Sequence, residues 1–283
     1  MILLPLETIK KMVKKIIKKI FKKLGYEIIK SNNLFLNNKQ CHKPAPFYDQ
    51  KFLIGDNKGI VVFDVGAHHG QTAVIYNRLF NNCRIYSFEP FIESFNILNE
   101  TVRNEKNIET FNLALGNIVG EVNFHVNKYS ATSSILPTHQ EGSNTWGENL
   151  LDTLKTIKVN STTIDDFIEK KGINQIDILK LDTQGTEYSI IEGAKKAIKK
   201  GIIKIIYLEI ITLPTYQGQK QFDEVLKLLR LNGFRLYNVY DYSFTQFGEL
   251  RQIDTIFIRN SFQFNDSKNN FNPTLRRNDS HIY

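Results

Sequence analysis

The chain is poor in cysteine and contains no long apolar run. Its 283 residues include only Cys41 and Cys83, with no CxxC pair and no Cys/His cluster at zinc spacing. This pattern supports neither a disulfide framework nor a structural zinc site. No segment approaches the roughly 18 uninterrupted apolar residues of a membrane-spanning helix. The first residues, MILLPLETI, are too short and are followed, not preceded, by lysines, so no secretory signal is expected. These features predict a cytoplasmic protein.

Acidic residues are missing from one segment, and that segment carries the whole charge excess. Residues 10–23 hold eight lysines and no acid, and the formal net charge of the chain is +8. The remainder is therefore close to neutral. A nucleic-acid binder usually spreads basic residues over a folded face and interleaves them with aromatics. No nucleic-acid partner is expected.

The same segment has the periodicity of an amphipathic helix. Apolar residues recur at helical spacing over 6–24, and Gly25 follows. Two placements of this helix remain open. It lies on an anionic membrane surface, as a peripheral contact with the inner face of the membrane, or it packs its apolar stripe on the rest of the protein. Residues 26–59, polar and containing Pro44 and Pro46, are expected to form a connecting segment with little regular structure.

From residue 60 onward, strand-like and helix-like segments alternate. The predicted strands are 60–65, 84–88, 109–113, 176–181 and 203–210, and the predicted helices are 70–80, 92–103, 188–200 and 219–232. Alternation of this kind predicts an α/β domain with a mainly parallel sheet over 60–260. Two further strands, 234–240 and 254–258, lack room for a crossover helix and should pair antiparallel. The polar tail, 261–283, is expected to be flexible.

The stretch VVFDVGAHHGQTA, residues 61–73, is typical of a strand that enters a helix through a glycine turn. Gly66 and Gly70 give GxxxG, which matches neither the phosphate loop GxxxxGK[ST] nor the dinucleotide motif GxGxxG. Glu89, in YSFEP after the next strand, stands 23 residues beyond Gly66, where an acid reaches a ribose diol. Turn and acid together predict an adenosine site. Alternatively, the glycines permit tight packing and Glu89 is a solvated acid.

Six ordered motifs, FDVGAHHG, FEP, NLALG, TTIDDF, DILKLDTQGTE and LEI, resemble those of FkbM-type methyltransferases. The resemblance implies a Rossmann-like class I fold, with a seven-stranded sheet whose last strand is antiparallel and helices on both faces. It also implies S-adenosylmethionine as cofactor and O-methylation of a sugar, glycan or related hydroxyl. The chain departs from the family pattern at His68, where asparagine is common, and at Thr186, where a large apolar residue is common.

The resemblance assigns a set of cofactor contacts. Asp64 and the turn at Gly66, Ala67, His68 and Gly70 should face the methionine part. Glu89 should bind the ribose, and the adenine should meet Pro90, Phe91, Asn112 and Ala114. Asn112 equally fits a cap on the following turn.

Three acids are expected at the carboxyl edge of the sheet, where open α/β folds place their ligands. Asp182, Glu187 and Glu209 are the catalytic candidates for removing the acceptor proton. Asp182 and Glu209 are also candidate ligands of a divalent cation. Glu187 equally fits a helix N-terminal acid. Lys180, in an apolar strand, either holds an acid in place or extends to solvent.

A long polar segment, 128–151, is predicted to cover the acceptor. Its candidate contacts are Ser133, Ser134 and Trp146, although a surface loop without function is the alternative. His125 and His139 are weaker candidates for a general base. The competing function for the whole chain is a non-catalytic membrane-surface or nucleic-acid binding protein that keeps the fold.

Overall fold

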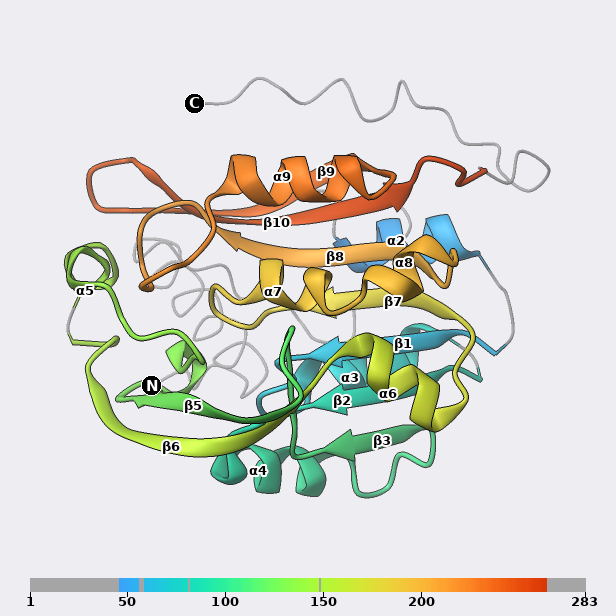
Figure 1. The fold of residues 1–283 in the computed structure, drawn as a ribbon, viewed down its shortest axis with the longest axis horizontal. Helices are drawn as coiled ribbons and strands as arrows, with labels where there is room; N and C mark the ends of the chain where they lie inside the picture. The colour runs from blue at the N-terminus through green and yellow to red at the C-terminus, as the bar shows by residue number, and fades with distance from the viewer. Residues whose placement is uncertain (1–45, 56–58, 81, 148, 264–283) are drawn as a thin grey trace, which may run out of the picture. The chain divides into compact units, whose positions relative to one another are not determined.

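A seven-stranded sheet with helices on both faces forms the body of the protein (Figure 1). The computed structural model describes residues 46–55, 59–80, 82–147 and 149–263. The predicted helix over 6–24 and the tail from 264 lie outside the described residues. The sheet has the order β3-β2-β1-β7-β8-β10-β9. Its strands are β1 (Val61–Val65), β2 (Arg84–Phe88), β3 (Ile108–Phe111), β7 (Ile176–Leu181), β8 (Ile203–Ile211), β9 (Phe234–Phe244) and β10 (Leu250–Arg259).

Only β10 runs against its neighbours in this sheet. β1 pairs in parallel with β2 and β7, β2 with β3, and β7 with β8. β10 is antiparallel to both β8 and β9. The antiparallel pairing predicted for the last two strands is confirmed, and both strands are longer than predicted. The fold is the Rossmann-like α/β architecture expected from the sequence.

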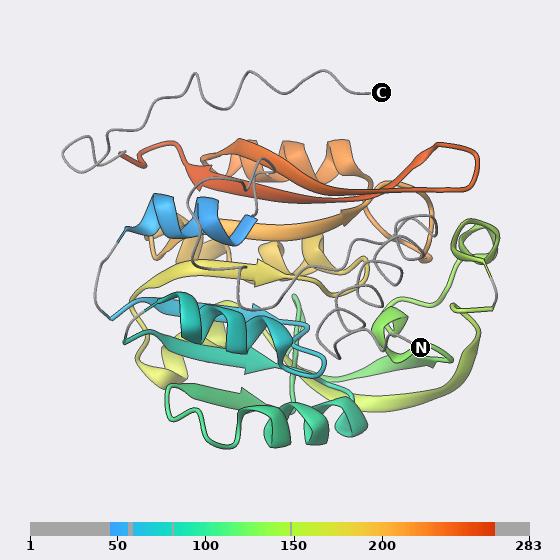
Figure 2. The same ribbon diagram turned by 180° about the vertical axis from the view of Figure 1, so that it is seen from behind.

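The helices divide between the two faces. α2 (Pro46–Ile54), α3 (Gln71–Leu79) and α4 (Ile92–Val102) cover the face seen in Figure 2. The opposite face carries α6 (Ile164–Lys171), α7 (Glu187–Glu192), α8 (Lys195–Lys199) and α9 (Phe222–Leu231). Successive strand residues point to opposite faces, so Val62 and Ile178 enter one core and Phe63 and Leu179 the other. Burial on both faces explains why the central strands are apolar without alternation.

Local capping explains where two of these helices begin and end. The Thr163 hydroxyl accepts the Asp166 N–H at 3.0 Å, and Gly172, with φ +67°, ends α6. The motif TTIDDF is therefore a helix start, with its acids in the first turn. Gln221 and Glu224 form a capping box at the start of α9.

Two predicted segments differ in the structure. Residues Pro46–Ile54 form a helix inside the expected connecting segment, because proline is well tolerated in the first turn of a helix. The helix predicted over 188–200 is interrupted between α7 and α8. A Cβ on Gly193 would lie 2.0 Å from the Gly116 carbonyl oxygen, so the chain makes a close backbone contact at this break.

A second, three-stranded sheet was not predicted from the sequence. It has the order β4-β6-β5 and consists of β4 (Ala114–Leu115), β5 (Gly120–Asn127) and β6 (Thr153–Thr162). β5 and β6 pair antiparallel, whereas β4 and β6 pair in parallel. The connection between β5 and β6 contains a 3-10 turn, η2 (Ser130–Thr132), and helix α5 (Gln140–Trp146). The expected long polar loop is thus partly helical.

Candidate functional site

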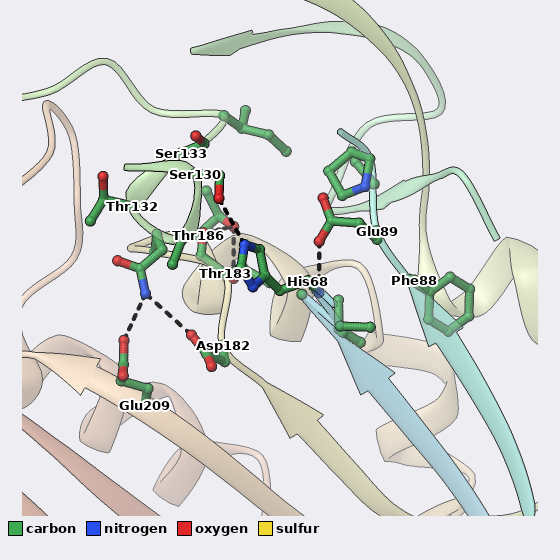
Figure 3. A pocket seen from close by; sticks show the side chains of 18 of the residues that line it. His68, Phe88, Glu89, Ser130, Thr132, Ser133, Asp182, Thr183, Thr186 and Glu209 are labelled. Atoms are coloured by element: carbon green, nitrogen blue, oxygen red, sulfur yellow. Dashed lines mark hydrogen bonds between the residues drawn. The ribbon is translucent and has the colours of Figure 1, made fainter. Parts of the chain in front are cut away.

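A cavity of about 330 Å³ lies where β1, β2, β7 and β8 reach their carboxyl ends. Its floor includes residues that follow or end these strands, namely Gly66, Glu89, Asp182 and Glu209. Its other side is formed by residues 129–133, Ile135 and Trp146, which we call the loop wall. Strand ends from one sheet and a wall from the β5–β6 connection therefore face one space (Figure 3).

The β1–α3 turn lies at the base of the cavity and depends on glycine. Gly66 has φ +73°, and a Cβ there would lie 1.8 Å from the Asp182 carbonyl oxygen. The Gly66 and Ala67 N–H groups both donate to the Phe88 carbonyl at 3.0 Å. Any side chain at this position would separate β1 from β7, so the tight turn fixes the distance between the two strand ends.

Glu89 is held by the backbone on both sides of its carboxylate. Oε2 accepts the His68 N–H and Oε1 accepts the Phe91 N–H, each at 2.9 Å. The side chain is buried, and burial raises the pKa of Glu89 to about 7 although both backbone donors oppose the shift. Each oxygen keeps acceptor capacity, because a carboxylate oxygen can accept more than one hydrogen bond.

Lys180 connects the turn with two carboxylates. Its Nζ lies 3.1 Å from Asp64 Oδ1 and 3.5 Å from Asp182 Oδ2, and it donates to the Gly66 carbonyl at 3.0 Å. Lys180 is buried, so it does not extend to solvent. Burial opposes its charge, but the two carboxylates raise its pKa on balance. Asp64 is fully buried; burial raises its pKa, and Lys180 opposes that shift.

Two carboxylates meet at the cavity floor through a shared amide. Gln184 Nε2 donates to Asp182 Oδ1 at 3.2 Å and to Glu209 Oε1 at 2.9 Å, as the dashed lines in Figure 3 show. Gln252 Nε2 donates to the other oxygen of Glu209. The Asp182 side chain keeps 40% of its surface exposed. Burial, followed by the neighbouring charge of Asp182, raises the pKa of Glu209 well above its ordinary value.

The loop wall supplies hydroxyl groups and one indole ring. Ser133 lines the cavity while its Oγ accepts the Asn127 N–H at 3.0 Å. Trp146 also lines the cavity, and its Nε1 donates to Thr215 Oγ1 at 3.1 Å. The Arg251 guanidinium stacks 4.5 Å from the centre of the indole ring. The ring is therefore fixed from two sides before any ligand arrives.

Sequence comparison assigns the family. The methyltransferase FkbM domain matches residues 64–236, which is more than half of the chain. The chain belongs to the FkbM methyltransferase family. A curated relative, 2-O-methyltransferase NoeI of Sinorhizobium fredii (strain NBRC 101917 / NGR234), is 24% identical over 175 residues, covering 60% of this chain and 70% of NoeI.

The solved structures that resemble this chain are more distant from it in sequence. Methyltransferase FkbM from Methylobacillus flagellatus KT is 13% identical with a TM-score of 0.41, covering 71% of this chain and 43% of that one. An S-adenosylmethionine-dependent methyltransferase from Aquifex aeolicus is 15% identical with a TM-score of 0.40, covering 86% and 98%. Membership of the FkbM family supports S-adenosylmethionine-dependent methylation as the activity class of this chain.

The cavity of this FkbM protein fits that cofactor. Glu89 presents a buried carboxylate at the end of β2, as a ribose diol requires. Pro90 and Ala114 line the cavity next to it and give an apolar surface for adenine. Gly66 and Ala67 also line the cavity, and their backbone N–H groups are bonded to the Phe88 carbonyl.

Several predicted cofactor contacts lie behind the cavity lining of this FkbM domain. Asp64 lies beneath the turn and reaches the cavity only through Lys180. Gly70 faces α4, where a Cβ would meet Leu98 at 2.8 Å. Phe91 is buried against Phe124 with ring centres 6.2 Å apart. The Asn112 amide donates to the Glu89 and Pro90 carbonyls at 2.9 Å each, so it caps the chain after β2.

Two other predicted residues form hydrogen bonds with the backbone and do not line the cavity. Glu187 Oε1 accepts the N–H groups of Thr183 and Gly185 and the Thr183 hydroxyl, at 2.8, 3.3 and 2.9 Å. Its carboxylate therefore holds the β7–α7 loop and does not line the cavity with Asp182, and burial raises its pKa. Ser134 Oγ donates to the Gln184 carbonyl at 2.7 Å and lies outside the lining.

Neither histidine considered as a base faces the cavity. His125 contacts the Thr156 hydroxyl at 3.0 Å, and His139 Nδ1 accepts the Glu141 N–H at 3.2 Å as the cap of α5. His68 does line it, and its Nε2 lies 2.9 Å from Ser130 Oγ. Burial, followed by the stacked ring of His69, lowers the pKa of His68 to about 4, so it is neutral at pH 7.

The sequence analysis missed two glutamines at the cavity. Gln184 lies in the quoted motif DILKLDTQGTE, two residues after Asp182, which was a usable signal. Gln252 reaches Glu209 only because β10 pairs with β8, and no local pattern indicates this. Thr186, noted as a departure from the family, lines the cavity and donates to the Thr183 hydroxyl at 2.9 Å.

Among the residues that the structure describes, no group of three or more His, Cys, Asp or Glu side chains is arranged to hold a metal ion. Within the same residues, no helix is long and apolar enough to cross a membrane.

Proposed function

We propose that this chain is an O-methyltransferase that transfers the methyl group of S-adenosylmethionine to a hydroxyl of a sugar, glycan or related acceptor. The observation that carries the proposal is the meeting, in one cavity, of the Gly66 turn and Glu89 with two adjacent carboxylates and the loop wall. The printed name of NoeI, a 2-O-methyltransferase, supports the choice of oxygen as acceptor atom.

The chemistry needs alignment and proton removal. S-adenosylmethionine supplies an electrophilic methyl group on a sulfonium, and the acceptor oxygen must approach it in line. Glu89 and the Gly66 turn would hold the nucleoside and methionine ends in one orientation. Asp182 and Glu209, at the floor of the same cavity, would accept the acceptor's proton as the new O–C bond forms. Asp182 is the better placed of the two for contact with an entering acceptor, because its side chain is partly exposed.

The loop wall supports a sugar as the acceptor. Trp146 presents an aromatic ring to the cavity, and sugar rings pack their C–H faces against such rings. Ser133 and Thr132 add polar groups beside it. An acceptor with both an apolar face and several hydroxyls matches this combination.

A radiolabel assay tests the proposal. The purified full chain is incubated with methyl-labelled S-adenosylmethionine and a panel of oligosaccharides that differ in free hydroxyls. We expect label on an oxygen of at least one glycan, and Trp146→Ala should raise the KM for that glycan about tenfold with cofactor affinity unchanged. Label transferred only to nucleic acid or protein would refute the glycan assignment.

The same assay separates two routes for the proton. If a carboxylate alone accepts the proton, methyl transfer survives exhaustive treatment with EDTA. If Asp182 and Glu209 hold a divalent cation that acidifies the acceptor hydroxyl, EDTA abolishes transfer and added Mg²⁺ restores it. We propose the route through a carboxylate.

A second proposal concerns location. We propose that residues 6–24 hold the enzyme at an anionic membrane surface, supported by their lysines and apolar spacing in the sequence.

A further inference from the structure

Gln184 has an uncommon backbone conformation for its residue type. It lies between β7 and α7 with φ +57°, and it is buried. The left-handed region is unfavourable for a non-glycine residue, and residues held in it concentrate at functional sites. The conformation directs its side chain between two strand ends.

The two hydrogens of the Gln184 amide serve carboxylates on neighbouring strands. Nε2 lies 3.2 Å from Asp182 Oδ1 and 2.9 Å from Glu209 Oε1. An amide nitrogen only donates, so both carboxylates are bonded as acceptors. Hydrogen bonds of this kind favour the ionised form of a carboxylate and weaken the repulsion between the pair.

The opposite end of the amide is held by a tyrosine. The Tyr216 hydroxyl contacts Gln184 Oε1 at 3.1 Å and the Thr132 carbonyl at 2.7 Å. Ionised carboxylates only accept hydrogen bonds, so the Gln184 nitrogen faces them and Oε1 faces the Tyr216 hydroxyl, whose single hydrogen is shared between Oε1 and the Thr132 carbonyl. Because Thr132 belongs to the loop wall, Tyr216 also connects this amide to that wall.

We propose that Gln184 is the positioning residue of the reaction: it holds Asp182 and Glu209 together as hydrogen-bond acceptors at the cavity floor, and Tyr216 contacts the opposite end of its amide. The inference rests on the proposed function for its catalytic meaning. Its structural part, the two carboxylates held by one amide, is independent of any acceptor.

Other charges also surround Glu209 and belong in the test. They are Lys180 on β7, Asp182 directly after β7, Glu187 on α7 and Asp254 on β10. Variants of Gln184 leave all four in place. A change in the titration of Glu209 in such a variant therefore reports the loss of the amide.

Two near-isosteric variants provide the perturbation. Gln184→Met removes both donors, and Gln184→Glu replaces them with a third carboxylate. The titration of Glu209 is followed by NMR of the ¹³C-carboxyl-labelled full chain, with the resonance assigned through Glu209→Gln. We expect the midpoint to rise by about one pH unit in Gln184→Met and further in Gln184→Glu. The acid limb of kcat should move in the same order, with unchanged affinity for S-adenosylhomocysteine.

Gln50→Met is the matched control. Gln50 is also buried and its Oε1 also contacts a tyrosine hydroxyl, that of Tyr76 at 2.8 Å, but it lies on α2 and not in the cavity lining. It should leave the midpoint of Glu209 unchanged. The inference is overturned if Gln184→Met lowers kcat without moving either midpoint, or if Gln50→Met moves the Glu209 midpoint equally. Absence of methyl transfer by the unmodified protein would refute the proposed function, while the NMR titration would still decide the role of Gln184.

Discussion

Ionisation of Glu89 should control cofactor affinity near neutral pH. Burial raises its pKa to about 7 in the free protein, and its two oxygens already accept the His68 and Phe91 N–H groups. Ribose hydroxyls donate best to the ionised carboxylate, so cofactor binding requires that form. Affinity should be maximal above pH 8 and should fall about tenfold per pH unit below pH 7.

The variant Glu89→Gln removes this dependence. A hydrogen bond to a charged group contributes about 1.5–3 kcal/mol, so the dissociation constant should rise roughly 10- to 150-fold at pH 8. The same variant should show a flat pH profile, because a neutral amide has no charge to lose. Titration calorimetry with S-adenosylhomocysteine between pH 5.5 and 8.5 measures both effects.

Glu93→Gln serves as the control for Glu89→Gln. The Glu93 side chain is 52% exposed and pairs with Lys155 outside the cavity, so its variant should bind as the unmodified protein does. Circular dichroism on each variant verifies that the fold persists. Equal affinity of the unmodified protein at pH 6 and pH 8, or of Glu89→Gln and the unmodified protein at pH 8, would refute the assignment of Glu89.

Three further predictions address chemistry, folding and location. Asp182→Asn should lower kcat by roughly 100-fold or more with cofactor affinity retained, and full activity would remove Asp182 from the catalytic residues. Gly66→Ala should lower the free energy of unfolding in urea by more than about 3 kcal/mol, because its Cβ would overlap the Asp182 carbonyl. Gly218→Ala, with open space around the new Cβ, should lower it by only about 1–2 kcal/mol. The full chain should sediment with anionic but not with neutral vesicles, and less of it should sediment at high salt, because each lysine near the surface contributes about 1 kcal/mol. A chain that starts at Gly25 should not sediment with either kind of vesicle. Equal sedimentation of both chains would contradict a membrane role for residues 6–24.

Local sequence was sufficient to predict a residue of the candidate site where that residue directly follows a buried strand. Gly66, Glu89 and Asp182 each come after an apolar run that forms a parallel strand, and parallel strands bring their carboxyl ends to one edge. The alternation of strand-like and helix-like segments then predicted a mainly parallel sheet. The cavity floor was therefore predictable from the sequence.

Side-chain direction and contacts between distant segments were not predictable. Glu187 follows the same strand as Asp182, yet its carboxylate turns back to the loop backbone. Gln252 reaches Glu209 across 43 residues, and Tyr216 reaches Gln184 across 32. Such contacts depend on strand register and loop geometry, which no local periodicity encodes. The β5–β6 sheet was missed because no strand was assigned on either side of the long polar segment.

The small β4-β6-β5 sheet and the segment between β5 and β6 contact the main body through Gln184, Thr215 and Tyr216. The whole loop wall lies between β5 and β6, and β6 returns to the body beside the two-residue strand β4. Insertions or deletions between these strands can reshape the wall while the Gly66 turn and Glu89 keep their positions, since loops vary more freely than the elements they connect. For engineering, we expect residues 120–162 to be exchanged together with Gln184, Thr215 and Tyr216, which bond to them, when the proposed acceptor is to be changed.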